Sequence, residues 1–376
     1  MEMEQNVAQA LLTEGATLVL LDVPVGTDVG IDIKSWNAGQ NFKGIKMIPP
    51  GIHFVHYSAV NKFGDSTPRV GFFHDFQKSE FLVKRWDKDK EDISSEADAP
   101  EEVVQRLKDN IKELDRYLGP YPYEILKPWT KLTNGITASL VARCSPLCGY
   151  VRSALELEHC SDASRPRGGE SDSKRRRSGR LTVEDREEQL LPDLKPRPGT
   201  ELRLTEISDK RYPDDATPSE ITRHSLDSSY VLDTTLKKLR EPIEIIGEMQ
   251  LTFICFLAGQ SLDAFEQWKK LVSLICDVDN AIPQYHSIYM EFLQALEVEL
   301  SYVPEEVLCD IVASNNFVYR SLCNLFGNIE SNFEVDGRLK SYAKRLQSRL
   351  TAKFLWDFSN LLEEMDDEAP VVVTLA

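Results

Sequence analysis

Residues 44–58 constrain the fold of this chain more than any other stretch. Pro49-Pro50-Gly51 separates two short apolar runs there. Each proline fixes its own φ, and glycine adopts the left-handed backbone that closes a tight turn. The flanking runs, residues 45–48 and 52–57, are therefore predicted to be two strands that meet at this turn as a hairpin.

Two histidines in the second run, His53 and His56, suggest chemistry at first sight. Side chains alternate along a strand, so residues three apart point to opposite faces and cannot jointly hold a metal ion. We therefore expect a mixture of surface and hydrogen-bonded core histidines. A hydrolase that uses the sheet domain, with His53, His56 or Asp22 in a cleft, stays as an alternative.

The first hundred residues contain further short runs of β-branched and aromatic residues, separated by turn residues. This pattern predicts a β-sandwich or a barrel-like domain. No long helix interrupts the runs, which argues against a doubly wound parallel sheet. From Pro100 onwards, apolar residues recur at helical spacing and predict trailing helices. The strand-like runs are Ala16 to Asp22, Val29 to Ile33, Arg69 to His74 and Glu80 to Trp86.

The second half reads as helix after helix. Residues 196–205 alternate and are expected to form a lone strand that docks against one of the domains. Thr217-Pro-Ser-Glu220 is a capping box with proline at the first helical position. Three apolar stripes follow, the first of them capped by Ser261, and they suit a helical bundle or a short solenoid. The stripes are Leu262, Phe265, Trp268, Leu271 and Ile275; Tyr285, Ile288, Phe292, Leu296 and Leu300; and Leu339, Tyr342, Leu346 and Leu350.

We therefore predict an α+β chain of two domains. Residues 1–155 form a β-rich amino-terminal domain with trailing helices, and residues 156–195 form a disordered linker with basic and acidic residues. Residues 196–362 form the all-α carboxy-terminal domain. Residues 363–376 form a tail with a β-prone strand.

Two short segments outside the predicted cores stand out. The linker carries a basic cluster, Lys174, Arg175, Arg176 and Arg177. It is a nuclear import signal, a basic patch controlled by phosphorylation of nearby serines, or a solvated charge run. The tail carries Val371, Val372 and Val373, which cannot bury themselves within one strand. This strand either pairs with a sheet of its own chain or adds to a partner's sheet.

Composition narrows the classes of function. With 44 basic and 61 acidic residues the net charge is −17, which disfavours direct binding to nucleic acid. The acidic start differs from a signal peptide and no apolar run is long enough for a membrane span, so we expect an intracellular protein without membrane contact.

No catalytic motif and no cofactor motif occurs, so we expect a protein that is not an enzyme. Cys144, Cys148, His159 and Cys160 lack the spacing of a structural zinc site, and no metal is expected. Cys255, Cys276, Cys309 and Cys323 lie in apolar helical patterns, as free buried thiols do.

The amino-acid sequence of residues 44–58 resembles that of the Aar-two family of splicing factors. The signature residues in the predicted hairpin are Met47, Pro49, Pro50, Gly51, His53, His56 and Tyr57. Gly30-Ile-Asp32, Leu118-Gly-Pro-Tyr-Pro-Tyr123, Ala216 to Thr222, Phe265 to Lys269, Arg349 to Phe358 and Ala369 to Val373 match as well. The resemblance spans both predicted domains. It is poor over residues 141–190, so the basic cluster cannot be carried over from the family.

The resemblance implies a VHS-like helical domain and a non-catalytic assembly chaperone of the U-five small nuclear ribonucleoprotein. Such a chaperone binds the RNase H-like and Jab/MPN-like domains of the scaffold Prp-eight and delays docking of the helicase Brr-two. Strand addition would fall on Val371, Val372, Val373, Thr374 and Leu375. A cytoplasmic and nuclear protein is expected. A peptide-binding trafficking adaptor stays open as an alternative.

Overall fold

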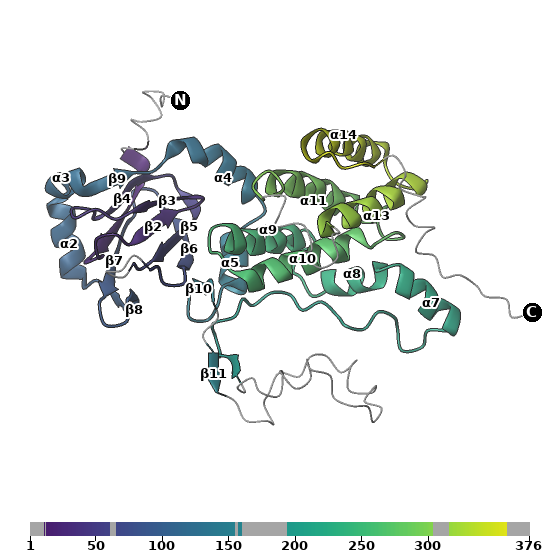
Figure 1. The fold of residues 1–376 in the computed structure, drawn as a ribbon, viewed down its shortest axis with the longest axis horizontal. Helices are drawn as coiled ribbons and strands as arrows, with labels where there is room; N and C mark the ends of the chain where they lie inside the picture. Colours follow the sequence, from purple (N-terminus) through teal and green to yellow (C-terminus); the bar gives the residue numbers. More distant parts are fainter. Residues whose placement is uncertain are drawn as a thin grey trace, which may run out of the picture.

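The computed structural model describes residues 11, 13–60, 65–154, 157–159, 194–303 and 316–358. It has a β-rich lobe and a helical lobe, which lie side by side and are bridged by α4 (Figure 1). The predicted division into a β-rich and an all-helical part is confirmed.

Two five-stranded sheets form the β-rich lobe. The first has the order β8-β7-β1-β4-β9, and the second has the order β10-β6-β5-β2-β3. The first sheet is mixed, because β1 pairs parallel with β7 and β4 pairs parallel with β9, whereas the second sheet is antiparallel throughout. The strands are β1 (Ala16–Leu21), β2 (Asp28–Ile31), β3 (Lys34–Asn37), β4 (Gly44–Ile48), β5 (Gly51–Ser58), β6 (Val70–Phe76), β7 (Phe81–Asp87), β8 (Asp92–Asp98), β9 (Leu118–Pro120) and β10 (Val151–Arg152).

The predicted hairpin at Pro49-Pro50-Gly51 is wrong. β4 and β5 do flank the turn, but β4 pairs with β1 and β9, and β5 pairs with β2 and β6. The turn therefore carries the chain from one sheet to the other. Gly51 has a φ of 129°, which only glycine adopts without strain, and Met47 at the end of β4 also has a positive φ, 60°.

Each sheet is covered on its outer side as well as packed against the other. Apolar side chains from both sheets, Leu18 and Val55 among them, share one buried core. Helices α2 (Glu101–Asp109) and α3 (Ile111–Leu114) cover the outer face of the first sheet through Val19 and Val83. Phe54 of the second sheet is fully buried in the core of the helical lobe.

Helices form the second lobe around α9, which is buried along most of its length. Such a helix is apolar nearly all round, so it occupies the centre of a bundle. The helices are α4 (Leu126–Leu132), α5 (Ala138–Cys144), α7 (Pro218–Leu226), α8 (Ser229–Leu236), α9 (Glu244–Leu257), α10 (Leu262–Cys276), α11 (His286–Glu299), α13 (Phe317–Ser331) and α14 (Gly337–Phe354), with short 3-10 turns η1 (Asp115–Tyr117) and η2 (Tyr123–Ile125).

Most local predictions for this lobe are confirmed. Thr217 and Glu220 form the capping box at the start of α7, and Ser261 caps α10. Leu262 is an exception, because its side chain is 69% exposed although the rest of its predicted stripe is buried. Cys255, Cys276 and Cys323 are buried, and Cys309 lies outside the described residues.

The lone strand predicted at residues 196–205 is only partly found. β12 (Leu194–Pro196) pairs with β11 (Leu157–His159), and residues 197–205 beyond it form no strand. They dock through both backbone and side-chain hydrogen bonds instead. Thr205 donates its backbone N–H to Oε2 of the buried Glu248 on α9 (3.0 Å), and Arg143 of α5 donates to Oε1 of the same carboxylate (2.6 Å).

Candidate functional site

Asp32 is the centre of the most highly connected polar cluster around the signature stretch. It follows β2 with a φ of 58° and is fully buried. Its Oδ2 accepts from the Tyr121 hydroxyl at 2.6 Å and contacts Nδ1 of His53 at 2.8 Å. Its Oδ1 accepts the backbone N–H of Phe54 at 3.0 Å, and its backbone carbonyl lies 3.2 Å from Nε2 of His56. One residue thus contacts both histidines.

His53 has no ring nitrogen left for chemistry. Nε2 contacts the carbonyl of Pro49 at 2.9 Å, while Nδ1 faces the Asp32 carboxylate. Both neighbours are acceptors, so a ring nitrogen that carries a hydrogen donates it to one of them. The side chain is 2% exposed, and Trp129 stacks on it. This arrangement stabilises the turn and holds no nitrogen ready to accept a proton from a substrate.

His56 lies on the opposite face of β5, as the strand period predicts, but it is buried too. The expectation that one of the two histidines lies at the surface is therefore wrong. A Cβ at Gly30 would come within 2.1 Å of the His56 ring, so glycine is required there. Burial and, to a lesser degree, the nearby Arg69 guanidinium lower the pKa of His56 to about 4, so the ring is neutral at physiological pH.

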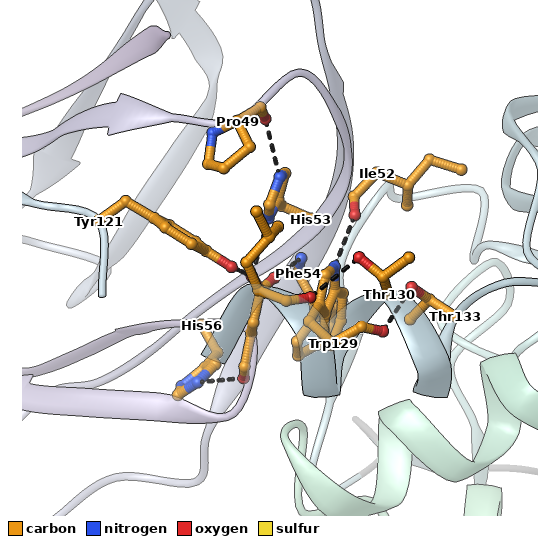
Figure 2. A network of polar contacts seen from close by, with 11 residues as sticks. Pro49, Ile52, His53, Phe54, His56, Tyr121, Trp129, Thr130 and Thr133 are labelled. Carbon is orange, nitrogen blue, oxygen red and sulfur yellow. Dashed lines mark hydrogen bonds and ion pairs between the residues drawn. The ribbon is translucent and has the colours of Figure 1, made fainter. Parts of the chain in front are cut away.

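Trp129 connects this cluster to the helical lobe. Its indole N–H donates to the carbonyl of Ile52 at 2.8 Å, and the Thr133 hydroxyl donates to its carbonyl at 2.8 Å. Figure 2 shows Tyr121, His53 and Trp129 converging around the bend after Pro49, with α4 behind them. The cluster therefore fixes the angle at which the chain passes from one sheet to the other and positions α4 against β5.

Tyr57, the last signature residue, belongs to a separate contact in the same strand. Its hydroxyl donates to Asp92, which also pairs with Arg152 at 2.9 Å. Burial, followed by the Asp92 carboxylate, raises the pKa of Tyr57 far above its ordinary value, so the phenol stays protonated. These contacts join β5, β8 and β10, so Tyr57 also has a structural role.

Asp22, the third residue named for the hydrolase alternative, is not placed for catalysis either. Asp22 is exposed and ion-paired with Arg85 at 3.6 Å, away from both histidines. His53 does share a buried site with a carboxylate, but both partners are fully engaged in hydrogen bonds. Nothing in this arrangement activates a nucleophile.

Other predicted sites lie partly or wholly outside the described residues. Val371, Val372, Val373, Thr374 and Leu375 and the basic residues Lys174, Arg175, Arg176 and Arg177 are not described. Among residues that are, no group of three or more His, Cys, Asp or Glu side chains could hold a metal ion. Cys144 is buried, and the Cys148 thiol donates to the carbonyl of Tyr150. No helix in the described part is long and apolar enough to cross a membrane.

Sequence reasoning missed Asp32, Tyr121 and Trp129 as partners of the signature histidines. Asp32 and Tyr121 occur in two of the quoted motifs, Gly30-Ile-Asp32 and Leu118-Gly-Pro-Tyr-Pro-Tyr123. Both motifs, like the signature stretch, match the same family although they lie far apart in the chain. That common match was the available signal that the three meet in space.

Comparison with known proteins decides the family. Two family models match, the AAR2 N-terminal domain over residues 14–146 and the AAR2 C-terminal repeat region over residues 204–359. The chain belongs to the AAR2 family. Relatives named "Protein AAR2 homolog" are 39% identical in Homo sapiens and 38% identical in Mus musculus, in each case covering 100% of this chain and 97% of the relative. The relative of the same name in Caenorhabditis elegans is 33% identical over 94% of this chain and 98% of its own length. The family suggested by the signature stretch is thus confirmed.

Proposed function

We propose that this AAR2-family chain is a non-catalytic pre-mRNA splicing factor, an assembly chaperone of the U-five small nuclear ribonucleoprotein. In this role it binds the carboxy-terminal region of Prp-eight, through the RNase H-like and Jab/MPN-like domains, and delays docking of Brr-two. The observation that carries the proposal is the full-length match to AAR2 homologues, which spans both lobes. A cytoplasmic and nuclear location accompanies this role.

The organisation of the two lobes supports a binding protein over an enzyme. The most connected polar cluster, around Asp32, is consumed by internal hydrogen bonds and holds the bend between the sheets. A buried cluster that is fully satisfied gives rigidity and a defined shape rather than reactivity. A rigid two-lobed surface with a net charge of −17 suits recognition of a partner with basic faces.

Deleting Pro370 to Ala376 tests the proposed strand addition. We expect the deletion to weaken binding to a Prp-eight fragment that contains the RNase H-like and Jab/MPN-like domains, because the backbone hydrogen bonds of the added strand would be lost. Binding is measured by titration calorimetry, and the circular dichroism spectrum checks that the fold is intact.

A matched control replaces Val371, Val372 and Val373 with threonine, which keeps the β-prone backbone but removes the apolar side chains. Strand addition predicts an intermediate loss for this control. Full-length affinity in the deletion variant would disprove strand addition. Capture of membrane-cargo tails with no affinity for the scaffold would favour the trafficking adaptor instead.

A further inference from the structure

A groove runs over the carboxy-terminal half of α11, between α4 and α14. Its volume is about 680 Å³. Ala295 and Val298 of α11 and the following Tyr302 line it together with Pro128 of α4 and Tyr342 of α14. α14 lies alongside α11 at the outer edge of the helical lobe (Figure 1). The groove thus offers an apolar floor between two helical walls.

The rim of the groove is positively charged. Lys127 and Lys131 are exposed on one face of α4, and neither has an ion pair or hydrogen bond within the described part of the chain. Arg349 stands on the opposite wall and pairs with Glu297. The second oxygen of Glu297 accepts from the Tyr342 hydroxyl at 2.8 Å. Glu297 is the one acidic residue among the described residues that line the groove, and it is already neutralised.

The helix that forms one wall is unusually basic for this protein. The 18 residues of α14 include no acidic residue, in a chain whose net charge is −17. Solvated surface helices mix both signs, so a helix of one sign in an oppositely charged protein indicates a binding surface for acidic groups. Its basic residues are Arg338, Lys340, Lys344, Arg345, Arg349 and Lys353.

The chain itself carries a segment of complementary chemistry. Residues 361–368 contain five acidic residues and no basic one, together with Leu361, Leu362 and Met365. Apolar residues at this spacing share one face when a segment coils helically, while the carboxylates flank them. An apolar face edged by carboxylates matches an apolar floor edged by lysine and arginine.

The segment begins at the correct end of the groove. Nζ of Lys353 donates to the carbonyl of Leu300 at 3.3 Å, so the last turn of α14 lies beside the end of α11, next to Tyr302. The described chain ends at Phe358, which packs against Phe326 of α13. Only Ser359 and Asn360 separate Phe358 from Leu361, and this link spans up to roughly 10 Å when extended. That length is close to the roughly 10–12 Å diameter of one helix, so Leu361 lies within reach of the last turn of α14.

We propose that the acidic segment 361–368 binds in the groove between α4 and α14 of its own chain. Its apolar side chains contact Val298, Tyr302 and Tyr342, and its carboxylates face Lys127, Lys131 and Arg349. One consequence rests on the proposed function: the adjacent Val371 to Val373 is held beside the groove until a partner's sheet withdraws it. The docking itself does not depend on that function.

Carbodiimide cross-linking of the full chain tests the docking. The reagent joins a lysine amine to a carboxylate only when the two are in direct contact, and mass spectrometry identifies the pair. We expect Lys127 and Lys131 to be joined to Glu363 through Glu368. Lys344 is the control, because it is exposed on α14, the opposite wall, but does not line the groove. Mixing isotopically light and heavy copies separates links within one chain from links between chains.

Charge reversal is a second test of the docking. K127E/K131E removes both lysines from the rim of the groove, and Arg349 is already paired with Glu297. Protection of the tail from limited proteolysis should therefore fall roughly three- to ten-fold, the range for two exposed ion pairs. Adding E363K/E364K to that variant should restore protection. The same reversal at Lys344 should change nothing.

Two results would overturn the proposal. One is that Lys127 and Lys131 link to the tail no more often than Lys344 does. The other is that all links join light to heavy copies, which would assign the groove to a second chain. A scaffold-binding assay separates the two ideas. If K127E/K131E frees the tail but leaves scaffold affinity unchanged, docking holds and its proposed link to strand addition fails.

Discussion

Asp32 illustrates how one residue can decide the geometry of a whole lobe. Its carboxylate accepts hydrogen bonds from a tyrosine and a backbone amide and contacts a ring nitrogen of one histidine, and its own carbonyl faces a second histidine. The sequence predicted a hydrogen-bonded core histidine, but not its partner. An aspartate in a short turn between strands is common, and only tertiary structure distinguishes one that is buried.

Removing the Asp32 side chain should destabilise the protein strongly. In Asp32→Ala the His53 ring and the Tyr121 hydroxyl lose their common acceptor while remaining buried, and each buried polar group left unsatisfied costs about 1–3 kcal/mol. Urea unfolding followed by tryptophan fluorescence measures the loss, since Trp129 stacks on His53. Asp75→Ala, at an exposed position of β6, is the control and should cost less than about 0.5 kcal/mol. A cost below about 1 kcal/mol for Asp32→Ala would contradict this view of the cluster.

Glu299, at the end of α11, is a buried acid of a different kind. Its Oε2 accepts from the Trp268 indole at 2.8 Å, and its Oε1 has no partner among the described residues. Burial raises the pKa of Glu299 to about 8, although the Trp268 hydrogen bond acts in the opposite direction. The folded protein therefore keeps a proton that the unfolded chain, with an ordinary value of 4.5, loses.

This difference predicts a pH dependence of stability. Between about pH 5 and pH 8 the folded state binds the extra proton, so the contribution of Glu299 to stability falls as the pH rises, by up to about 1.4 kcal/mol per pH unit. In Glu299→Gln this part of the slope should disappear. Urea unfolding at pH 5.5, 6.5 and 7.5 measures it, with Glu291→Gln on the same helix as the control. Equal slopes in wild type and Glu299→Gln would show that the carboxyl is ionised in the folded protein.

At the scale of elements, local signals were read correctly where they are satisfied locally. The capping box of α7 and the serine cap of α10 are formed by neighbours in sequence, so the pattern alone defines them. The bend at Pro49-Pro50-Gly51 is also local, but the partners of its strands are not. A turn signal cannot state whether the two strands pair with each other, because pairing depends on strands elsewhere in the chain.

The cap of α7 gives a prediction at this scale. α7 has no buried residue, so its stability depends on its own ends more than on packing. Thr217→Ala removes the capping hydroxyl, worth about 1 kcal/mol, and should speed amide hydrogen exchange in residues 218–226 about five-fold. Global unfolding should stay unchanged. Thr222→Ala, within the same helix, serves as the control, and uniform exchange in all three proteins would count against the cap.

For the whole molecule, composition and periodicity predicted the two kinds of lobe but not how they join. The joint consists of Phe54, which is buried among helices, and Trp129, which donates to Ile52 in the sheet. Aromatic residues in a strand and in a short helix give no sign of which core they enter. Arg69, just before β6, donates a hydrogen bond to the carbonyl of Ala258, 189 positions later, a separation that no local pattern encodes.

The bend between the sheets also has a consequence for how the chain can fold during synthesis. The first sheet is completed only by β9, at residues 118–120, and the second only by β10, at residues 151–152. Helices α4 and α5 lie between these strands in sequence. α5 packs against α9 and α4 packs against α11, and both partners are made a hundred or more residues later. Most of the helical lobe must therefore leave the ribosome before the β-rich lobe has its final neighbours. Until then the side chain of Phe54 lacks the helical core that buries it in the folded protein.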